Sequence, residues 1–64
     1  MNLQPTTIRI ELRRRIWRVT VDDRFYGDYR SERHAVNSAE AAASTLRARG
    51  RIAHIMPPVK VEPK

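Results

Sequence analysis

Arginine is the residue type in this chain with the clearest capacity for chemistry. The flat guanidinium group can pair through two hydrogen bonds with a phosphate or with the edge of a guanine base, whereas a lysine acts as a point charge. Five arginines fall within the first eighteen residues, and we take them as the candidate nucleic-acid-binding residues: Arg9, Arg13, Arg14, Arg15 and Arg18.

The charge balance of the whole chain agrees with a polyanionic partner. The formal net charge is +6, and every basic residue except Lys60 and Lys64 is an arginine. Basic residues cluster in segments 1–20 and 46–64, whereas acidic residues concentrate in segment 21–45. A nucleic-acid footprint requires such clustering. One alternative is that the arginines reflect a GC-rich coding sequence and have no role in binding. Another is that Arg9 and Arg13, each two residues from Glu11, form a local charge ladder with it on a solvated strand face.

No catalytic or metal-binding constellation is recognisable. The chain has no cysteine, and its two histidines, His34 and His54, have no further ligands nearby in the sequence. The adjacent acids Asp22 and Asp23 suit a turn better than a metal site. We therefore expect no enzyme activity, no cofactor, no metal and no small-molecule substrate. No apolar run approaches the roughly 18 residues of a membrane span, and the first residues lack a signal peptide pattern, so a cytoplasmic protein without membrane association is expected.

Two alternating segments are expected to position the arginines. Apolar residues at every second position predict a strand from Thr6 to about Leu12, and a second strand over 16–21 with Trp17 on the apolar face and Arg18 on the polar face. The connection over 13–15 lacks glycine, asparagine, aspartate and proline, which is unusual for a tight hairpin. A tight turn would crowd three arginines, and a polyanion would relieve their repulsion. The alternative is a wider, solvated loop.

Aromatic residues dominate the third expected strand, over 25–29. Gly27 in its middle indicates a bulge or a close approach by the helix, and a bulge would let Tyr26 and Tyr29 point inward together. Phe25 competes with Tyr26 for the same face. We expect Phe25 to join Trp17 and Tyr29 in the core. The alternative is that these aromatic side chains stack on nucleobases.

A helix rich in alanine follows. Ser31 is a suitable N-cap, and the helix is expected to run to about Arg49 and to stop at Gly50. Its apolar face combines Ala35, Val36, Ala39, Ala42, Ala43 and Leu46. These mostly small residues predict close packing against a sheet whose bulky side chains supply the volume.

The chain order predicts an α+β fold with the element order β-β-β-α-β: a three-stranded antiparallel meander packed on one helix, with a short fourth strand over 51–56. We expect residues 6–56 to form this single domain and residues 1–5 to be flexible. Three of the four prolines lie in segment 57–64, which predicts an extended or flexible tail.

Two resemblances accompany this pattern. The run 17–21, followed by Tyr26, Gly27, Asp28 and Tyr29 and then by Ser31, resembles the DNA-binding domains of plant ethylene-response factors and the N-terminal DNA-binding domain of integrases. Such domains lay a three-stranded sheet in the major groove. The resemblance implies that Arg13, Arg15 and Arg18 contact bases or phosphates.

Segment 16–55 is also similar to a small bacterial domain family of unknown function with a ββαβ-like fold. The shared features are a strand tryptophan, the Tyr29-Arg30-Ser31 entry to the helix, alanines four residues apart and a glycine before the last strand. This resemblance implies a fold but no activity.

Two functions therefore remain open. The first is a small nucleic-acid-binding protein, with DNA favoured over RNA, that uses an arginine-bearing sheet face. The second is a protein-interaction module, such as a phage- or prophage-encoded modulator, that binds an acidic protein partner. Open sheet edges could also pair two copies into a homodimer.

Overall fold

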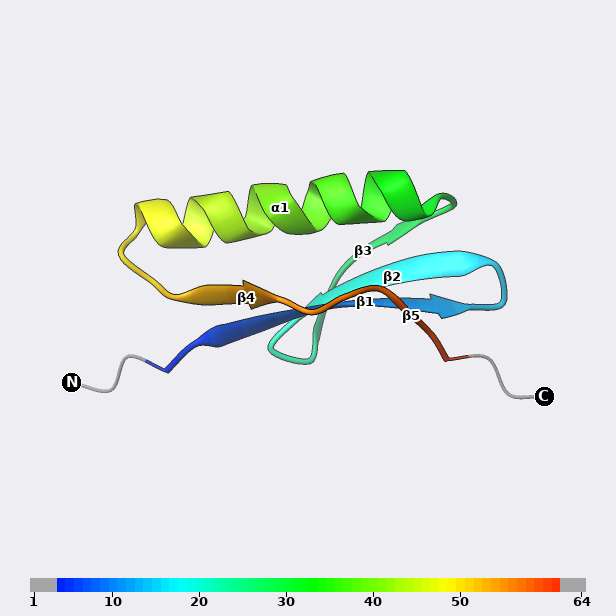
Figure 1. The fold of residues 1–64 in the computed structure, drawn as a ribbon, viewed down its shortest axis with the longest axis horizontal. Helices are drawn as coiled ribbons and strands as arrows, with labels where there is room; N and C mark the ends of the chain where they lie inside the picture. Colours follow the sequence, from blue (N-terminus) through cyan, green and yellow to red (C-terminus); the bar gives the residue numbers. More distant parts are fainter. Residues whose placement is uncertain (1–3, 62–64) are drawn as a thin grey trace.

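The computed structural model describes residues 4–61, and they form one sheet covered by one helix (Figure 1). The elements, in chain order, are β1 (Thr6–Arg13), β2 (Ile16–Val21), β3 (Arg24–Tyr29), α1 (Glu32–Ala48), β4 (Ala53–Ile55) and β5 (Val59–Lys60). Strands β1, β2 and β3 form the expected antiparallel meander, and β4 is the expected short extra strand. The α+β prediction is confirmed.

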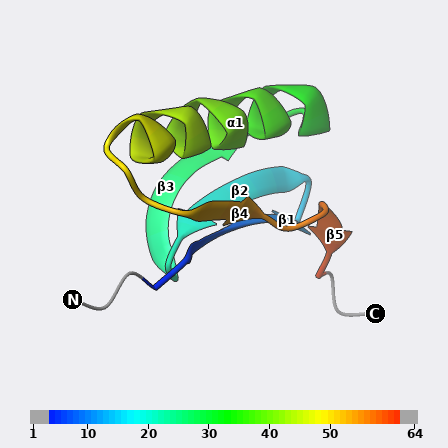
Figure 2. The ribbon, with the colours of Figure 1, turned by 60° about the vertical axis from the view of Figure 1, so that its left-hand side comes forward.

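Strand β1 lies in the middle of the sheet. The strand order is β3-β2-β1-β4, and β5 also pairs with β1. Strands β4 and β5 both run parallel to β1, one after the other along its length. A parallel return needs a crossover, and α1 supplies it over one face of the sheet (Figures 1 and 2). Among the described residues, no element covers the opposite face, which we call the open face.

Both hairpin turns contain two residues with positive φ. Arg14 and Arg15 have φ values of 49° and 69°, and Asp22 and Asp23 have values of 51° and 67°. This pair of left-handed residues is the type I′ arrangement, whose twist matches that of the flanking strands. The first turn is therefore tight, and the alternative of a wider loop over 13–15 is wrong.

The helix begins and ends close to the expected residues. The Ser31 side chain accepts a hydrogen bond of 3.1 Å from the backbone N–H of His34, which caps the N-terminus. At the other end, the N–H groups of Gly50 and Arg51 donate to carbonyls of the last turn, and Gly50 has a φ of 80° that suits glycine.

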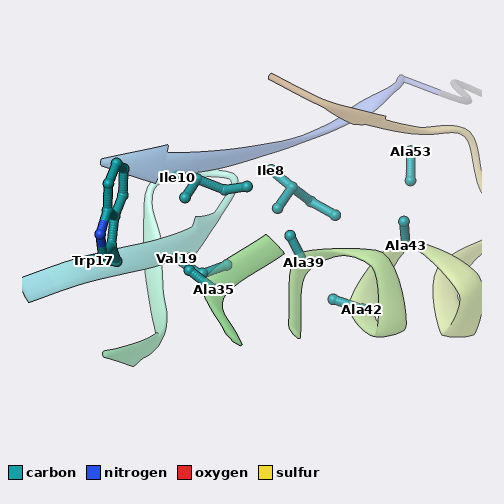
Figure 3. Packing of buried hydrophobic residues seen from close by; sticks show 9 residues of the cluster. All are labelled: Ile8, Ile10, Trp17, Val19, Ala35, Ala39, Ala42, Ala43 and Ala53. Atoms are coloured by element: carbon teal, nitrogen blue, oxygen red, sulfur yellow. The ribbon is translucent and has the colours of Figure 1, made fainter. Parts of the chain in front are cut away.

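The core combines bulky sheet residues with small helix residues (Figure 3). Ile8, Ile10 and Val19 are fully or almost fully buried, and Trp17 is only 8% exposed. They face the alanine side of α1, as Figure 3 shows. The buried alanines are Ala35, Ala39, Ala42, Ala43 and Ala53. Small side chains bring the helix backbone close to the sheet, as predicted from the sequence.

Strand β3 departs from regular pairing at a bulge. The register shifts between Val19 and Thr20, so that Val19 pairs with Gly27 and Thr20 pairs with Phe25. Tyr29 then lies on the helix side, where its hydroxyl is 2.6 Å from Ser38 Oγ. Gly27 leaves space for this ring, because a Cβ at Gly27 would meet the Tyr29 hydroxyl oxygen at 2.6 Å.

The bulge also overturns the expectation that Phe25 belongs to the core. Phe25 is opposite Thr20 on the open face and is 63% exposed. Tyr26 takes the helix side instead and lines a hollow together with Ala42 and Leu46. The extra residue in the bulged strand reverses the faces of Phe25 and Tyr26.

The C-terminal segment 57–64 was predicted to be an extended or flexible tail that leaves the fold, but its described part is extended and returns to the sheet. After Pro57 and Pro58, Val59 and Lys60 pair with Glu11 and Leu12 of β1. The backbone N–H of Val61 donates to the Leu12 carbonyl at 2.9 Å. The prolines interrupt pairing only between β4 and β5. Residues 62–64, like residues 1–3 of the expected N-terminal lead-in, lie outside the described residues.

Candidate nucleic-acid interface

The strand register places the candidate arginines on the open face and at its end. Side chains of directly paired residues share a face. Arg9 pairs with Thr20, and Arg13 pairs with Ile16. Arg18 pairs with Glu11 on one side and with Asp28 on the other. Since these pairs alternate with the buried pairs, they point away from α1.

The five predicted residues thus divide into two groups, and all of them are exposed. Arg9, Arg13 and Arg18 lie in strands, whereas Arg14 and Arg15 form the β1–β2 turn. The alternation of β1 and β2 brings the strand residues to one face, as the sequence predicted. The turn adds its two arginines at the edge of that face beside Arg13.

Arg18 is held by a carboxylate on the neighbouring strand. Its Nε donates to Asp28 Oδ1 at 2.9 Å, and its Nη2 donates to Asp28 Oδ2 at 3.1 Å. These hydrogen bonds lower the pKa of Asp28 and raise the pKa of Arg18 relative to their ordinary values. The Arg18 guanidinium carbon also lies over the Phe25 ring, 5.1 Å from its centroid. The Arg18 charge is therefore partly neutralised and fixed in position.

Arg9 has a weaker ionic contact. Its Nε is 4.0 Å from Asp23 Oδ1, and the Asp23 side chain is 91% exposed. An exposed pair at this distance contributes little, because water and salt screen it. Arg9 can leave Asp23 for another anion at small cost.

The β1–β2 hairpin end holds the least compensated positive charge on this face. Within residues 4–61, no carboxylate lies within ion-pair distance of Arg13, Arg14 or Arg15. A shallow hollow of about 250 Å³ opens beside them, and its walls are Arg13, Arg14, Ile16, Arg18 and Asp28. The preferred position for an anion is thus the hairpin end rather than the sheet centre.

Two residues of this face were not expected from the sequence. Asp28 competes with any anion for Arg18, and Phe25 places an aromatic ring beside the arginines. The pairing of Asp28 follows from the antiparallel register, which the sequence pattern alone does not specify. The exposure of Phe25 depends on the bulge, for which Gly27 is the only signal in the sequence.

Metal-binding clusters and membrane-spanning helices were two further possibilities for the described residues. Among residues 4–61, no group of three histidine, cysteine or acidic side chains could hold a metal ion. Within the same part of the chain, no helix has the length and apolar character needed to cross a membrane. His54 is exposed and points to the open face, since it pairs with Thr7.

The fold and this face define a small α+β domain with an uncovered sheet face and a basic hairpin. Comparison with known proteins gives no match: no family model, no curated protein and no solved structure is similar enough to assign the chain to a family. The resemblances to DNA-binding domains and to the small bacterial family therefore stay predictions.

Proposed function

We propose that this protein binds nucleic acid, with DNA favoured, through the β1–β2 hairpin and the adjoining open face. The observation that carries the proposal is the group formed by Arg13, Arg14 and Arg15, none of which forms an ion pair with a carboxylate of the described residues. Three guanidinium groups at one tight turn repel one another, and a run of phosphates removes that repulsion.

The division of roles follows from the contacts. Arg13, Arg14 and Arg15 are exposed and unrestrained, so they suit contacts to successive phosphates. Arg9 can join them when it releases Asp23. Arg18 is held in place by Asp28, so it suits a contact at one fixed position better than a contact that follows a moving phosphate. Binding through phosphates supplies affinity without selecting a base sequence.

The backbone of the turn adds support to this proposal. Residues other than glycine, asparagine and aspartate rarely adopt positive φ, and each such residue costs on the order of 1 to 3 kcal/mol. The first turn nevertheless uses two arginines at φ values of 49° and 69°. A strained pair of identical charged residues at an exposed turn is consistent with a binding role that offsets the strain.

The test is a fluorescence-anisotropy titration of a labelled DNA at several salt concentrations. Arg13, Arg14 and Arg15 are changed together to glutamine, and the matched control changes Arg24, Arg33 and Arg49, which are exposed and lie outside the hairpin. Both variants lose three charges. We expect the hairpin variant to bind at least about tenfold more weakly, with a salt dependence reduced by roughly one counterion per lost phosphate contact.

The control variant should keep most of the affinity and the original salt dependence, since its arginines contact no phosphate. Circular dichroism verifies that both variants are folded. Equal losses in the two variants would show that only net charge matters and would contradict a hairpin site. Absence of binding by the unchanged protein at low salt would reject the proposed function and favour an acidic protein partner.

A further inference from the structure

Phe25 is the large hydrophobic residue in the most unusual position. Its exposed fraction of 63% exceeds that of the other exposed large hydrophobic residues among residues 4–61. Single exposed hydrophobic side chains are common on protein surfaces, so exposure alone is not informative. The position of Phe25 is informative, because the ring lies on the basic open face and contacts one of the five arginines.

The surroundings of the ring are fixed by the sheet. Thr20 pairs with Arg9 on one side and with Phe25 on the other, so these three side chains form a row across three strands. Adjacent strands are about 4.8 Å apart, which places Arg9 about two strand spacings from Phe25. The Arg18 guanidinium lies over the ring and is held there by Asp28.

This arrangement offers a stacking surface between basic groups. An aromatic ring or an immobilised guanidinium plane can stack against the flat face of a nucleobase. In a duplex, neighbouring base pairs already cover these faces, so an exposed ring gains little from it. An unpaired base presents its face freely, and the phosphates on either side can reach Arg9 and the hairpin.

We infer that the open face is selective for single-stranded nucleic acid and that Phe25, together with Arg18, stacks on an unpaired base. This inference rests on the proposed function and specifies its substrate class. A strand lying across the face would place a base on Phe25 and its backbone along the basic hairpin residues. Charge complementarity supports this occupant over a second copy of the chain, which would bring the same arginines against one another.

The experiment compares two labelled DNAs of the same sequence, about 12 nucleotides long to suit a site of this kind. One is single-stranded, and the other is annealed to its complement. The variants are Phe25→Ala, Phe25→Leu and Phe25→Tyr. Ile52→Ala serves as the matched control, because Ile52 is 47% exposed and lies before β4, away from the five arginines.

We expect the unchanged protein to bind the single strand more tightly than the duplex. Phe25→Ala and Phe25→Leu should weaken single-strand binding by about 5- to 150-fold, the range found when one base–aromatic stack is removed. Phe25→Tyr and Ile52→Ala should stay close to the unchanged protein. Duplex binding should be nearly the same in all variants.

A second readout does not depend on affinity. Phe25→Trp adds an exposed indole to a chain whose own Trp17 is 8% exposed. Its fluorescence should be quenched by the single strand and much less by the duplex. Equal binding of both DNAs, or no loss in Phe25→Leu, would overturn the inference while leaving the hairpin site intact. If the unchanged protein bound neither DNA, even at low salt, the proposed function itself would be rejected.

Discussion

At the scale of single residues, Asp28 determines how much of the Arg18 charge is available. The two hydrogen bonds between them, of 2.9 and 3.1 Å, fix the guanidinium over Phe25. The same carboxylate repels a polyanion that approaches the open face. For the proposed nucleic-acid binding, Asp28 therefore has two opposing effects: it orders Arg18 and it weakens the local positive potential.

We predict that Asp28→Asn strengthens binding of a labelled DNA at low salt by about 2- to 5-fold, because one negative charge beside the site is removed. The increase should shrink as salt rises, since screening weakens this charge effect. Anisotropy titrations at two salt concentrations measure both. Glu32→Gln is the matched control, because Glu32 is exposed in the first turn of α1 and outside the open face. Weaker binding by Asp28→Asn would mean that ordering of Arg18 dominates.

The acid sensitivity of folding shows independently whether the ion pair forms in solution. Arg18 lowers the folded-state pKa of Asp28 below its value of 3.8 in a model compound. The ion pair therefore stabilises the folded state fully at a pH above the unfolded-state pKa of Asp28. This stabilisation is lost as the pH falls through the lowered folded-state pKa. Urea unfolding of the protein and of Asp28→Asn should therefore differ at neutral pH and converge in acid. A pH-independent difference would contradict the ion pair.

At the scale of elements, the β1–β2 hairpin combines a strained turn with the basic group. The type I′ turn favours asparagine followed by glycine, whereas this chain has Arg14 and Arg15 at positive φ. The second hairpin uses Asp22 and Asp23 in the same conformation, and Asp22 Oδ1 accepts a 2.9 Å hydrogen bond from the N–H of Thr7. Aspartate suits these positions, so only the first turn carries unexplained strain.

We predict that replacing Arg14 by Asn and Arg15 by Gly raises the free energy of unfolding by about 1 to 3 kcal/mol, because the strain is relieved. If the proposed function holds, DNA affinity should fall at the same time, since the two proposed phosphate contacts are lost. Urea denaturation followed by Trp17 fluorescence measures stability, and anisotropy measures binding. A lysine pair at the same positions keeps the charge and the strain, so it should change neither quantity much. Greater stability with unchanged DNA affinity would show that Arg14 and Arg15 do not contribute to binding.

The elements themselves were predictable from the sequence for local reasons. Alternating apolar residues around Trp17 specify a strand, and Ser31 and Gly50 delimit the helix. The alanine face of α1 also follows from its spacing. These signals are carried by neighbouring residues, so they survive without knowledge of the tertiary structure.

The misjudged features depend on pairings between distant residues. The face that Phe25 occupies is set by the register shift between Val19 and Thr20. The extra residue of the bulge moves the preceding residues of β3 to the opposite face of the sheet. The Arg18–Asp28 pair likewise needs the β2–β3 register. The arginine group could be named from the sequence because three of its members are consecutive, whereas the place of Phe25 beside these arginines could not, because it depends on the pairing of another strand.

At the scale of the whole molecule, both sheet edges are irregular. Strand β3 is bulged and carries charged residues, and the opposite edge is interrupted by Pro57 and Pro58 between β4 and β5. Such edges discourage pairing with a second sheet. Homodimer formation through an edge, which the sequence left open, stays a prediction that this architecture does not favour.

Strand β5 also connects the C-terminal segment to the proposed site. In a small domain, a short strand is a sizeable share of the structure, so the loss of β5 should have a measurable effect on stability. Strand β5 pairs with Glu11 and Leu12, the two residues of β1 that directly precede Arg13. The segment thereby supports the hairpin at the end where its arginines are grouped.

We predict that the amide protons of Met56 and Val61 are protected from hydrogen exchange, because they donate to the carbonyls of Ile8 and Leu12 at 2.9 Å. A chain that ends at Met56 should lose about 1 to 2 kcal/mol of unfolding free energy, as expected for a few cross-strand hydrogen bonds. A chain that ends at Val61 keeps β5 and should match the full chain. If Val61 exchanged as fast as an unstructured peptide, and if both truncations left stability unchanged, β5 would not form in solution. The hairpin arginines would then extend from an unsupported strand end, and removing residues 57–64 would leave their DNA affinity unaffected apart from the lost lysine charges.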